Sequence, residues 1–132
     1  MNFVSARIIT DDVAGLVGFY ETATGVSAEW STPDFAELVV GRGTLAIGST
    51  RTVALFGAGS AHAADNHSVI LEFLVDDVDV VPARVAHDVV VQQPTTMPWG
   101  NRSLLVRDPD GNLVNFFTPV TPEAVAKFAA RR

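Results

Sequence analysis

The second half of this sequence repeats the plan of the first half. Residues 4–10 form a short, β-branched apolar segment that is followed by Asp11-Asp12, and residues 68–75 form a similar segment that is followed by Asp76-Asp77. A segment predicted to be helical follows each aspartate pair, and three short extended segments follow each helix. Such a repeat constrains the fold strongly, because it indicates two tandem βαβββ modules.

The first module is predicted over about residues 3–56. Asp12 can cap a helix that begins at Val13, and Gly25 stands where a helix of this length is expected to stop. The three extended segments that follow are residues 27–31, 36–40 and 44–50. A tight turn at residues 41–43 joins the last two.

The second module is predicted over about residues 67–118, after a linker at about residues 57–66 that is rich in small and polar residues. Its helix is expected at residues 78–86, with Pro82 near the first turn. Its later strands are expected at residues 88–93, 102–107 and 112–118. The tetrapeptide Asp108-Pro109-Asp110-Gly111 is a turn signal between the last two strands.

A final helix is predicted at about residues 121–131. Thr121 can cap it, Pro122 suits its first position, and the basic end Arg131-Arg132 complements the helix dipole. The predicted fold class is therefore α+β, with a single domain over residues 1–132 made of two tandem βαβββ modules and a C-terminal helix.

Composition limits the partners. The net charge of -6 has the wrong sign for binding a phosphate backbone or an anionic membrane. The chain has no cysteine, so thiolate chemistry and cysteine-based zinc sites are excluded. No apolar run approaches the roughly 20 residues of a membrane span, and the N-terminus lacks the pattern of a signal peptide. We therefore expect a cytoplasmic protein that binds neither nucleic acid nor membrane.

Three stretches carry a resemblance to a known family. The segment Pro98-Trp99-Gly100-Asn101-Arg102, followed by residues 106–114, resembles the C-terminal signature of the glyoxalase/bleomycin resistance protein/dioxygenase (vicinal oxygen chelate) superfamily. Phe19-Tyr20 and residues 75–79 are similar to the family's other landmarks. The resemblance implies an open, cup-shaped mixed sheet with a ligand in the cup, a frequent homodimer, and often a divalent metal at the floor of the cup.

The resemblance also implies where a metal would bind. Family ligands are His, Gln or Glu on the first strand of each module and Glu on the last strand. The corresponding positions here are Ser5, Ile70 and Asn115, with the fourth falling near Ile47. Two aliphatic side chains, one hydroxyl and one amide do not hold a divalent ion. The expectation is therefore no metal and no cofactor, as in the antibiotic-binding members that lack a metal.

The other titratable side chains suggest no catalytic group. His62, His67 and His87 are scattered rather than spaced as a ligand pair, so we expect them at the surface. Asp108 and Asp110 form a carboxylate pair, but the turn explains both residues. No catalytic residue is predicted.

Strand alternation predicts which residues face the cup. Ser5, Arg7 and Ile9 share one side of the first strand, whereas Ala6 and Ile8 face the helix. In the second module the same rule places these residues on the inner side: Ile70, Glu72, Leu74, Leu113, Asn115 and Phe117. Arg7 and Glu72 occupy equivalent places, so they either pair across the cup floor or reach solvent at a strand edge.

Two tryptophans and one arginine have two interpretations each. Trp30 and Trp99 lie where a strand should approach the cup rim, so each either stacks on a flat ligand or packs in the core or a dimer interface. Arg102 either meets an anionic ligand group or bonds to loop carbonyls. The candidate ligand-binding residues are Arg7, Trp30, Glu72, Trp99, Asn115 and Phe117.

The leading functional hypothesis is a small-molecule binding protein that sequesters an antibiotic or an aromatic metabolite without a metal. The alternative is a superfamily enzyme, similar to a lyase or dioxygenase, that recruits a divalent metal through other residues. A regulatory or accessory domain is a third possibility with little support. A two-fold homodimer is expected, because half-open cups leave apolar strand edges.

Overall fold

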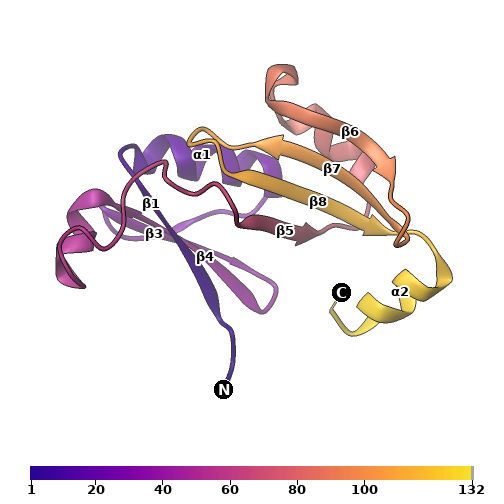
Figure 1. The fold of residues 1–132 in the computed structure, drawn as a ribbon, viewed down its shortest axis with the longest axis horizontal. Helices are drawn as coiled ribbons and strands as arrows, with labels where there is room; N and C mark the ends of the chain where they lie inside the picture. The colour runs from indigo at the N-terminus through magenta and orange to yellow at the C-terminus, as the bar shows by residue number, and fades with distance from the viewer. Residues whose placement is uncertain (132) are drawn as a thin grey trace. The chain divides into compact units, whose positions relative to one another are not determined.

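The expected repeat is present as two units, residues 1–66 and residues 67–132, in a computed structural model that describes residues 1–131. Each unit contains one four-stranded mixed sheet with its own helical segments (Figure 1). Within each unit the first strand runs parallel to the last one, and the remaining strands pair antiparallel. The α+β class and the doubled βαβββ plan are therefore confirmed.

Unit 1 begins with β1 (Ser5–Thr10) and α1 (Val13–Thr24). Asp12 caps α1, since its Oδ1 accepts a hydrogen bond of 3.0 Å from the Gly15 amide. Gly25 ends the helix in the left-handed conformation, with φ of +75°. The remaining elements are β2 (Glu29–Thr32), β3 (Phe35–Val40), β4 (Gly43–Ser49) and the 3₁₀ helix η1 (Thr50–Leu55). The strand order is β1-β4-β3-β2.

One face of the first sheet packs on α1. The buried residues of this core are apolar and come from α1, β3 and β4: Leu16, Val17, Tyr20, Ala23, Ala36, Leu38, Leu45 and Ile47. Burial of this many aliphatic and aromatic side chains supplies the main favourable free energy for folding of the unit. The opposite face of the sheet has no α-helix of its own unit on it.

Unit 2 has the strand order β5-β8-β7-β6, which Figure 1 shows side by side. Its strands are β5 (Ile70–Leu74), β6 (Val90–Thr96), β7 (Asn101–Arg107) and β8 (Leu113–Pro119). Its helical segments are η2 (Val78–Arg84), η3 (His87–Val89), α2 (Pro122–Phe128) and η4 (Ala129–Arg131). The basic end that we predicted for the last helix includes Arg132, which lies outside the described residues.

The second module differs locally from its prediction. The helix predicted over residues 78–86 is the 3₁₀ helix η2, in which Asp77 accepts a hydrogen bond of 3.0 Å from the Asp79 amide. Pro82 lies inside it and has no N–H to donate, which disfavours a continuous α-helical ladder. Residues 87–89 also form a 3₁₀ turn, so β6 begins two residues later than predicted.

The turn at residues 108–111 is confirmed. The Gly111 amide donates to the Asp108 carbonyl over 2.9 Å, and Gly111 has φ of +83°, which favours glycine. Asp108 is buried and accepts hydrogen bonds from the Asp110 amide and from both the amide and the side chain of Asn112. These bonds give the Asp108 side chain a structural role in the turn, to which Asp110 contributes its backbone amide.

Helix α2 packs back onto unit 2. Thr121 caps it, with its hydroxyl 3.3 Å from the Ala124 amide, and Pro122 occupies its first position. Phe128 contacts Phe117 of β8, with ring centroids 5.1 Å apart. Figure 1 shows α2 following the end of β8. The helix therefore covers the part of the sheet that surrounds Phe117.

Candidate functional site

The two faces of the second sheet differ in what covers them. Helix η2 packs on one face, where Phe73 stacks on Phe116 and where the Val78 amide donates to the Thr118 hydroxyl over 2.9 Å. The register places the other side chains on the opposite face, which we call the open face of the second sheet. It comprises Ile70, Glu72, Leu74, Asn101, Ser103, Leu105, Leu113, Asn115 and Phe117.

Asn115 and Glu72 form a polar pair at the centre of this open face. They lie opposite each other in the β5–β8 register, and the Asn115 Nδ2 donates to Glu72 Oε2 over 2.7 Å. Asn115 is only 8% exposed, and its Oδ1 has no hydrogen-bond partner. A buried carbonyl without a donor is costly, so this atom is a ready acceptor for a donor from a ligand or a water.

Two neighbouring side chains also have a buried oxygen without a hydrogen-bond partner. Asn101 and Ser103 are buried on β7, and neither the Asn101 Oδ1 nor the Ser103 Oγ has a hydrogen-bond partner. The β7–β8 register places both on the open face with Asn115. Our sequence reasoning missed them, although alternation on β7 would have found them as polar residues on the same face as Leu105.

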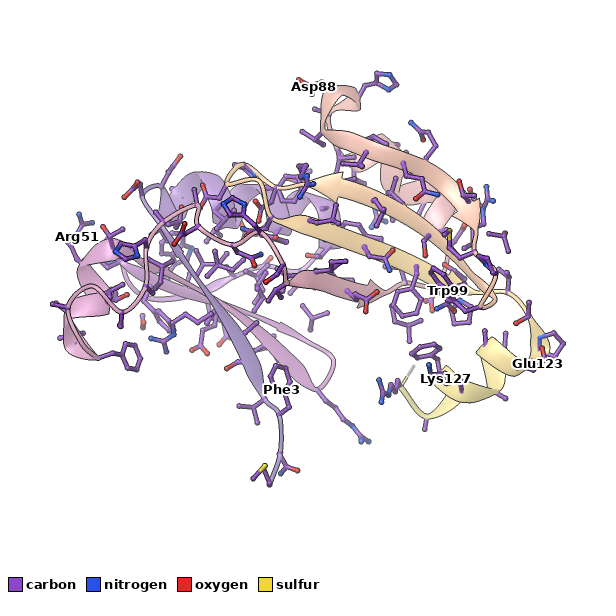
Figure 2. The ribbon with its side chains drawn as sticks, viewed as in Figure 1. Phe3, Arg51, Asp88, Trp99, Glu123 and Lys127 are labelled. Carbon is purple, nitrogen blue, oxygen red and sulfur yellow. The ribbon has the colours of Figure 1, made fainter. Side chains whose placement is uncertain are left out.

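The predicted aromatic residues lie in different settings. Phe117 is on the open face but is 6% exposed, because Phe128 of α2 lies against it. Trp99 is 65% exposed and stands on a turn closed by a 2.9 Å bond from the Gly100 amide to the Met97 carbonyl. Figure 2 places Trp99 at the end of the second sheet from which α2 leaves.

The first sheet places Arg7 on the face opposite α1. Its register partner on β4 is Ala46, and its guanidinium carbon lies 4.7 Å from the Phe35 ring centroid and 4.9 Å from that of Phe56. Arg7 and Glu72 thus each contact residues of their own unit, and a pairing between them stays a prediction. Trp30 is exposed, but its register partner is the buried Ala36, in the row that α1 covers.

Arg102 pairs with an aspartate rather than with a loop carbonyl, and a contact with an anionic ligand group stays a prediction. Its Nη2 lies 2.9 Å from Asp79 Oδ1, and its Nε is within 3.1 Å of both carboxylate oxygens. The Arg102 guanidinium therefore lowers the pKa of the Asp79 carboxyl below its usual value. This ion pair links η2 to β7 on the sheet face that η2 covers.

The histidines are exposed, as predicted. His62 has Asp65 as a neighbour, with 3.9 Å between Nδ1 and Oδ2, and His67 and His87 are also at the surface. No three His, Cys, Asp or Glu side chains of residues 1–131 gather closely enough to hold a metal ion. Within the same residues, no helix is long and apolar enough to cross a membrane.

Comparison with known proteins decides the family. The sequence profile of the Glyoxalase/Bleomycin resistance protein/Dioxygenase superfamily matches residues 2–116, which is most of the chain. The chain belongs to this superfamily. Helix α2 lies beyond the matched region. No curated protein sequence matches the chain significantly.

Solved structures of the superfamily share the fold at low sequence identity. A glyoxalase/bleomycin resistance protein/dioxygenase family enzyme from Burkholderia phytofirmans PsJN has a TM-score of 0.77 and 20% identity over 88% of this chain and 97% of its own. A superfamily protein from Nocardioides has a TM-score of 0.72 and 18% identity over 92% and 85%. A lactoylglutathione lyase from Agrobacterium tumefaciens has a TM-score of 0.64 and 22% identity over 89% and 92%.

The superfamily's metal positions carry poor ligands in this member. Ser5 and Ile70 stand on the first strands, and Asn115 stands on the last strand of unit 2. The fourth position was predicted near Ile47, which is wrong, because Ile47 is buried against α1. The β4 residue equivalent to Asn115 is Ala46. Ala46 pairs with Arg7 of β1, as Asn115 pairs with the equivalent Glu72 of β5. These side chains do not fit a divalent ion.

Proposed function

We propose that this superfamily member binds a small organic molecule on the open face of its second sheet, through Asn115 and Glu72 and without a divalent metal. One observation carries the proposal: the Asn115 Oδ1 is buried on that face and has no hydrogen-bond donor. Proteins rarely leave such an atom unpaired, because its desolvation costs roughly 1 to 3 kcal/mol. A ligand N–H or O–H group would supply the missing donor.

The surrounding groups define the chemistry of this ligand. The Glu72 carboxylate and the side-chain oxygens of Asn101, Ser103 and Asn115 all accept hydrogen bonds, so the face is rich in acceptors. The ligand should therefore carry N–H or O–H donors on an otherwise apolar or aromatic body. Leu105 offers apolar surface on the same face, and the exposed Trp99 offers a ring for stacking at its end, whereas Phe117 is covered by Phe128.

A ligand screen followed by titration tests this proposal. Planar antibiotics and aromatic metabolites that carry N–H or O–H donors are screened by thermal shift, since a ligand of the native state raises the melting temperature. For a compound that binds, Asn115→Leu should weaken binding by at least about tenfold in titration calorimetry. Gln93→Leu, which removes an exposed amide of β6, is the matched control and should bind as the parent does. Equal binding by Asn115→Leu would contradict the proposed site.

The competing function is a superfamily enzyme that uses a divalent metal. It draws on the likeness of fold to the lactoylglutathione lyase, which at 22% identity concerns the fold alone. Metal analysis of natively purified protein separates the two functions. One equivalent of tightly bound zinc, nickel, manganese or iron would favour the enzyme and overturn binding without a metal. An antibiotic as the ligand, a role in resistance, a homodimer and a cytoplasmic location stay predictions.

A further inference from the structure

A second group of side chains, on unit 1, has features of a binding site. Arg7 lies on β1, on the sheet face opposite α1, and its guanidinium carbon is within 4.9 Å of the ring centroids of both Phe35 and Phe56. Phe35 belongs to β3, whereas Phe56 follows η1 and is 72% exposed. Two other segments of unit 1 thus each place an aromatic ring against the guanidinium of Arg7.

Gly48 allows this arrangement. A Cβ at this position would lie 3.5 Å from the Phe35 ring, 3.7 Å from Ile9 and 2.8 Å from the Thr52 hydroxyl. The missing side chain therefore gives Phe35 and η1 room on this face of the sheet. Thr52 in turn donates to the Ser49 carbonyl over 2.7 Å, which holds the start of η1 in place before Phe56.

Arg7 differs in its contacts from three other arginines, and its ring contacts are closer than that of Arg131 with Phe128, at 5.8 Å. Arg51 pairs with Asp34, Arg102 pairs with Asp79, and Arg107 donates to the Gly111 carbonyl over 3.1 Å. Within residues 1–66, Arg7 has only the two rings as partners, and no carboxylate there pairs with it. Aromatic rings attract a guanidinium over its flat face, which leaves its five N–H donors at the edge for another group.

We propose that Arg7, Phe35 and Phe56 form a subsite for the carboxylate group of a small aromatic acid. A guanidinium edge matches a carboxylate with two parallel hydrogen bonds, and the exposed Phe56 ring can stack on the aromatic part of the ligand. The net charge of -6 disfavours a polyanion such as nucleic acid, so the fitting ligand is small and carries a single charge. The proposal uses contacts of unit 1 alone and is independent of Asn115.

The test is an NMR titration of the full chain with benzoate, with neutral benzamide as the matched probe. The arginine Nε–Hε signals are followed, and that of Arg7 is assigned by its loss in Arg7→Gln. Benzoate should move the Arg7 signal to saturation with a dissociation constant on the order of 1 mM, and benzamide should not move it. Arg42→Gln, which removes another exposed arginine of unit 1, should leave the benzoate titration unchanged.

Three further variants keep the result interpretable. Phe56→Leu keeps an apolar side chain but removes the ring, and should weaken benzoate by at least about 3-fold. Arg7→Lys keeps the charge but loses the planar edge, and should also weaken it. Asn115→Leu should leave benzoate binding at Arg7 unchanged, so this proposal and the second-sheet site fail separately. Benzoate binding that survives in Arg7→Gln, or shifts of Arg7 and Arg42 that rise together without saturation, would overturn the subsite.

Discussion

At the scale of single residues, two buried asparagines near the start of β8 have opposite roles. Asn112 is fully engaged, because its amide and its side chain both donate to the buried Asp108 carboxylate, over 2.9 Å and 2.8 Å. Asn115 donates to Glu72 but leaves its own Oδ1 without a partner. Asn112 therefore stabilises the fold, whereas Asn115 keeps an unpaired acceptor that a ligand or a water can satisfy.

This contrast predicts opposite effects on stability. Asn112→Ala should lower the free energy of unfolding by about 1 to 3 kcal/mol, because it leaves the buried Asp108 carboxylate short of a donor. Asn115→Leu should leave stability unchanged or raise it by up to about 1 kcal/mol, because it removes an unsatisfied acceptor while the exposed Glu72 finds water. Urea unfolding of the two variants and the parent measures both effects. A large loss of stability in Asn115→Leu would show that this amide serves the fold.

Trp99 should matter for binding and not for stability. Its side chain is largely exposed and makes no ring contact or hydrogen bond within residues 1–131. We expect Trp99→Ala to change the free energy of unfolding by less than about 0.5 kcal/mol and to weaken a screened ligand by about 1 to 3 kcal/mol. Calorimetry and melting curves on the same samples give the two quantities. His62→Ala and His87→Ala are the controls, and a histidine variant that loses the ligand while Trp99→Ala keeps it would place the site elsewhere.

At the scale of elements, Gly100 decides how α2 joins unit 2. Its φ of +93° favours glycine, and an added Cβ would meet the Thr121 hydroxyl at 2.1 Å and the Ala124 Cβ at 3.1 Å. Thr121 caps α2, and α2 carries the Phe128 that covers Phe117. A side chain at position 100 would therefore push the helix away from the open face of the second sheet.

Gly100→Ala should accordingly cost about 2 to 4 kcal/mol of stability, from backbone strain and overpacking together. Gly111→Ala is the matched control, because Gly111 has φ of +83° but open space around its Cα. It should cost only about 1 kcal/mol, from the backbone alone. Urea unfolding gives both values, and equal losses would mean that the contact of α2 with the turn is weak.

The link between η2 and β7 predicts a dependence on pH. The pKa of Asp79 is held below its usual value of 3.8 by Arg102, so the carboxylate form is favoured in the folded state. This contribution to stability is present above the unfolded pKa and is lost as pH falls through the lower folded pKa. Asp79→Asn should therefore be less stable than the parent near neutral pH, and the two should converge as the pH falls below the lowered pKa of Asp79.

Urea midpoints of both proteins, measured near pH 6 and at successively lower pH, follow this convergence. High salt should shrink the difference, because the pair is partly exposed. Asp88→Asn is the control, since Asp88 is exposed and pairs with no arginine in residues 1–131. A difference between Asp79→Asn and the parent that stays constant with pH would show that the loss comes from packing.

At the scale of the whole chain, the repeat made most of the fold predictable. The caps at Asp12 and Thr121 and the turn at Gly111 are local signals, so the sequence places them correctly. The sheet face on which a residue lies is harder to predict, because an error of one residue moves its side chain to the opposite face. That error accounts for the wrong choice of Ile47, whose neighbour Ala46 occupies the equivalent position.

Partners of long polar side chains were the least predictable part of the candidate site. Glu72 and Asn115 were placed on the correct face by alternation, but their hydrogen bond depends on the register of β5 against β8. The pairing of Arg102 with Asp79 depends on the path of η2, which the sequence does not specify. The sequence pattern thus predicts which face of a sheet a side chain lies on, whereas contacts between distant segments are seen only in the folded structure.

The edge strands of the two sheets differ in how well they could pair with a strand of a second copy of the chain. The edge strands β2 and β6 have shifts in register, and β6 also contains Pro94, features that protect an edge from pairing. The edge strands β1 and β5 have neither feature, and each pairs with its neighbour without a shift. Ile70 of β5 is also 48% exposed. Within each unit, the edges suited to accept another strand are therefore those of β1 and β5.

We predict a two-fold homodimer that uses such an unprotected edge. Sedimentation between about 1 and 100 μM should show a species of twice the chain mass, because closed symmetric pairs are the commonest way to cover exposed apolar edges. Ile70→Lys should weaken the dimer at least about tenfold, because a charge beside the edge must be desolvated on pairing. Val91→Lys on the protected β6 edge is the matched control, since Val91 is similarly exposed at 53%, and it should stay dimeric. A monomer at all concentrations would refute the dimer, and an unchanged dimer in Ile70→Lys would place its interface away from β5.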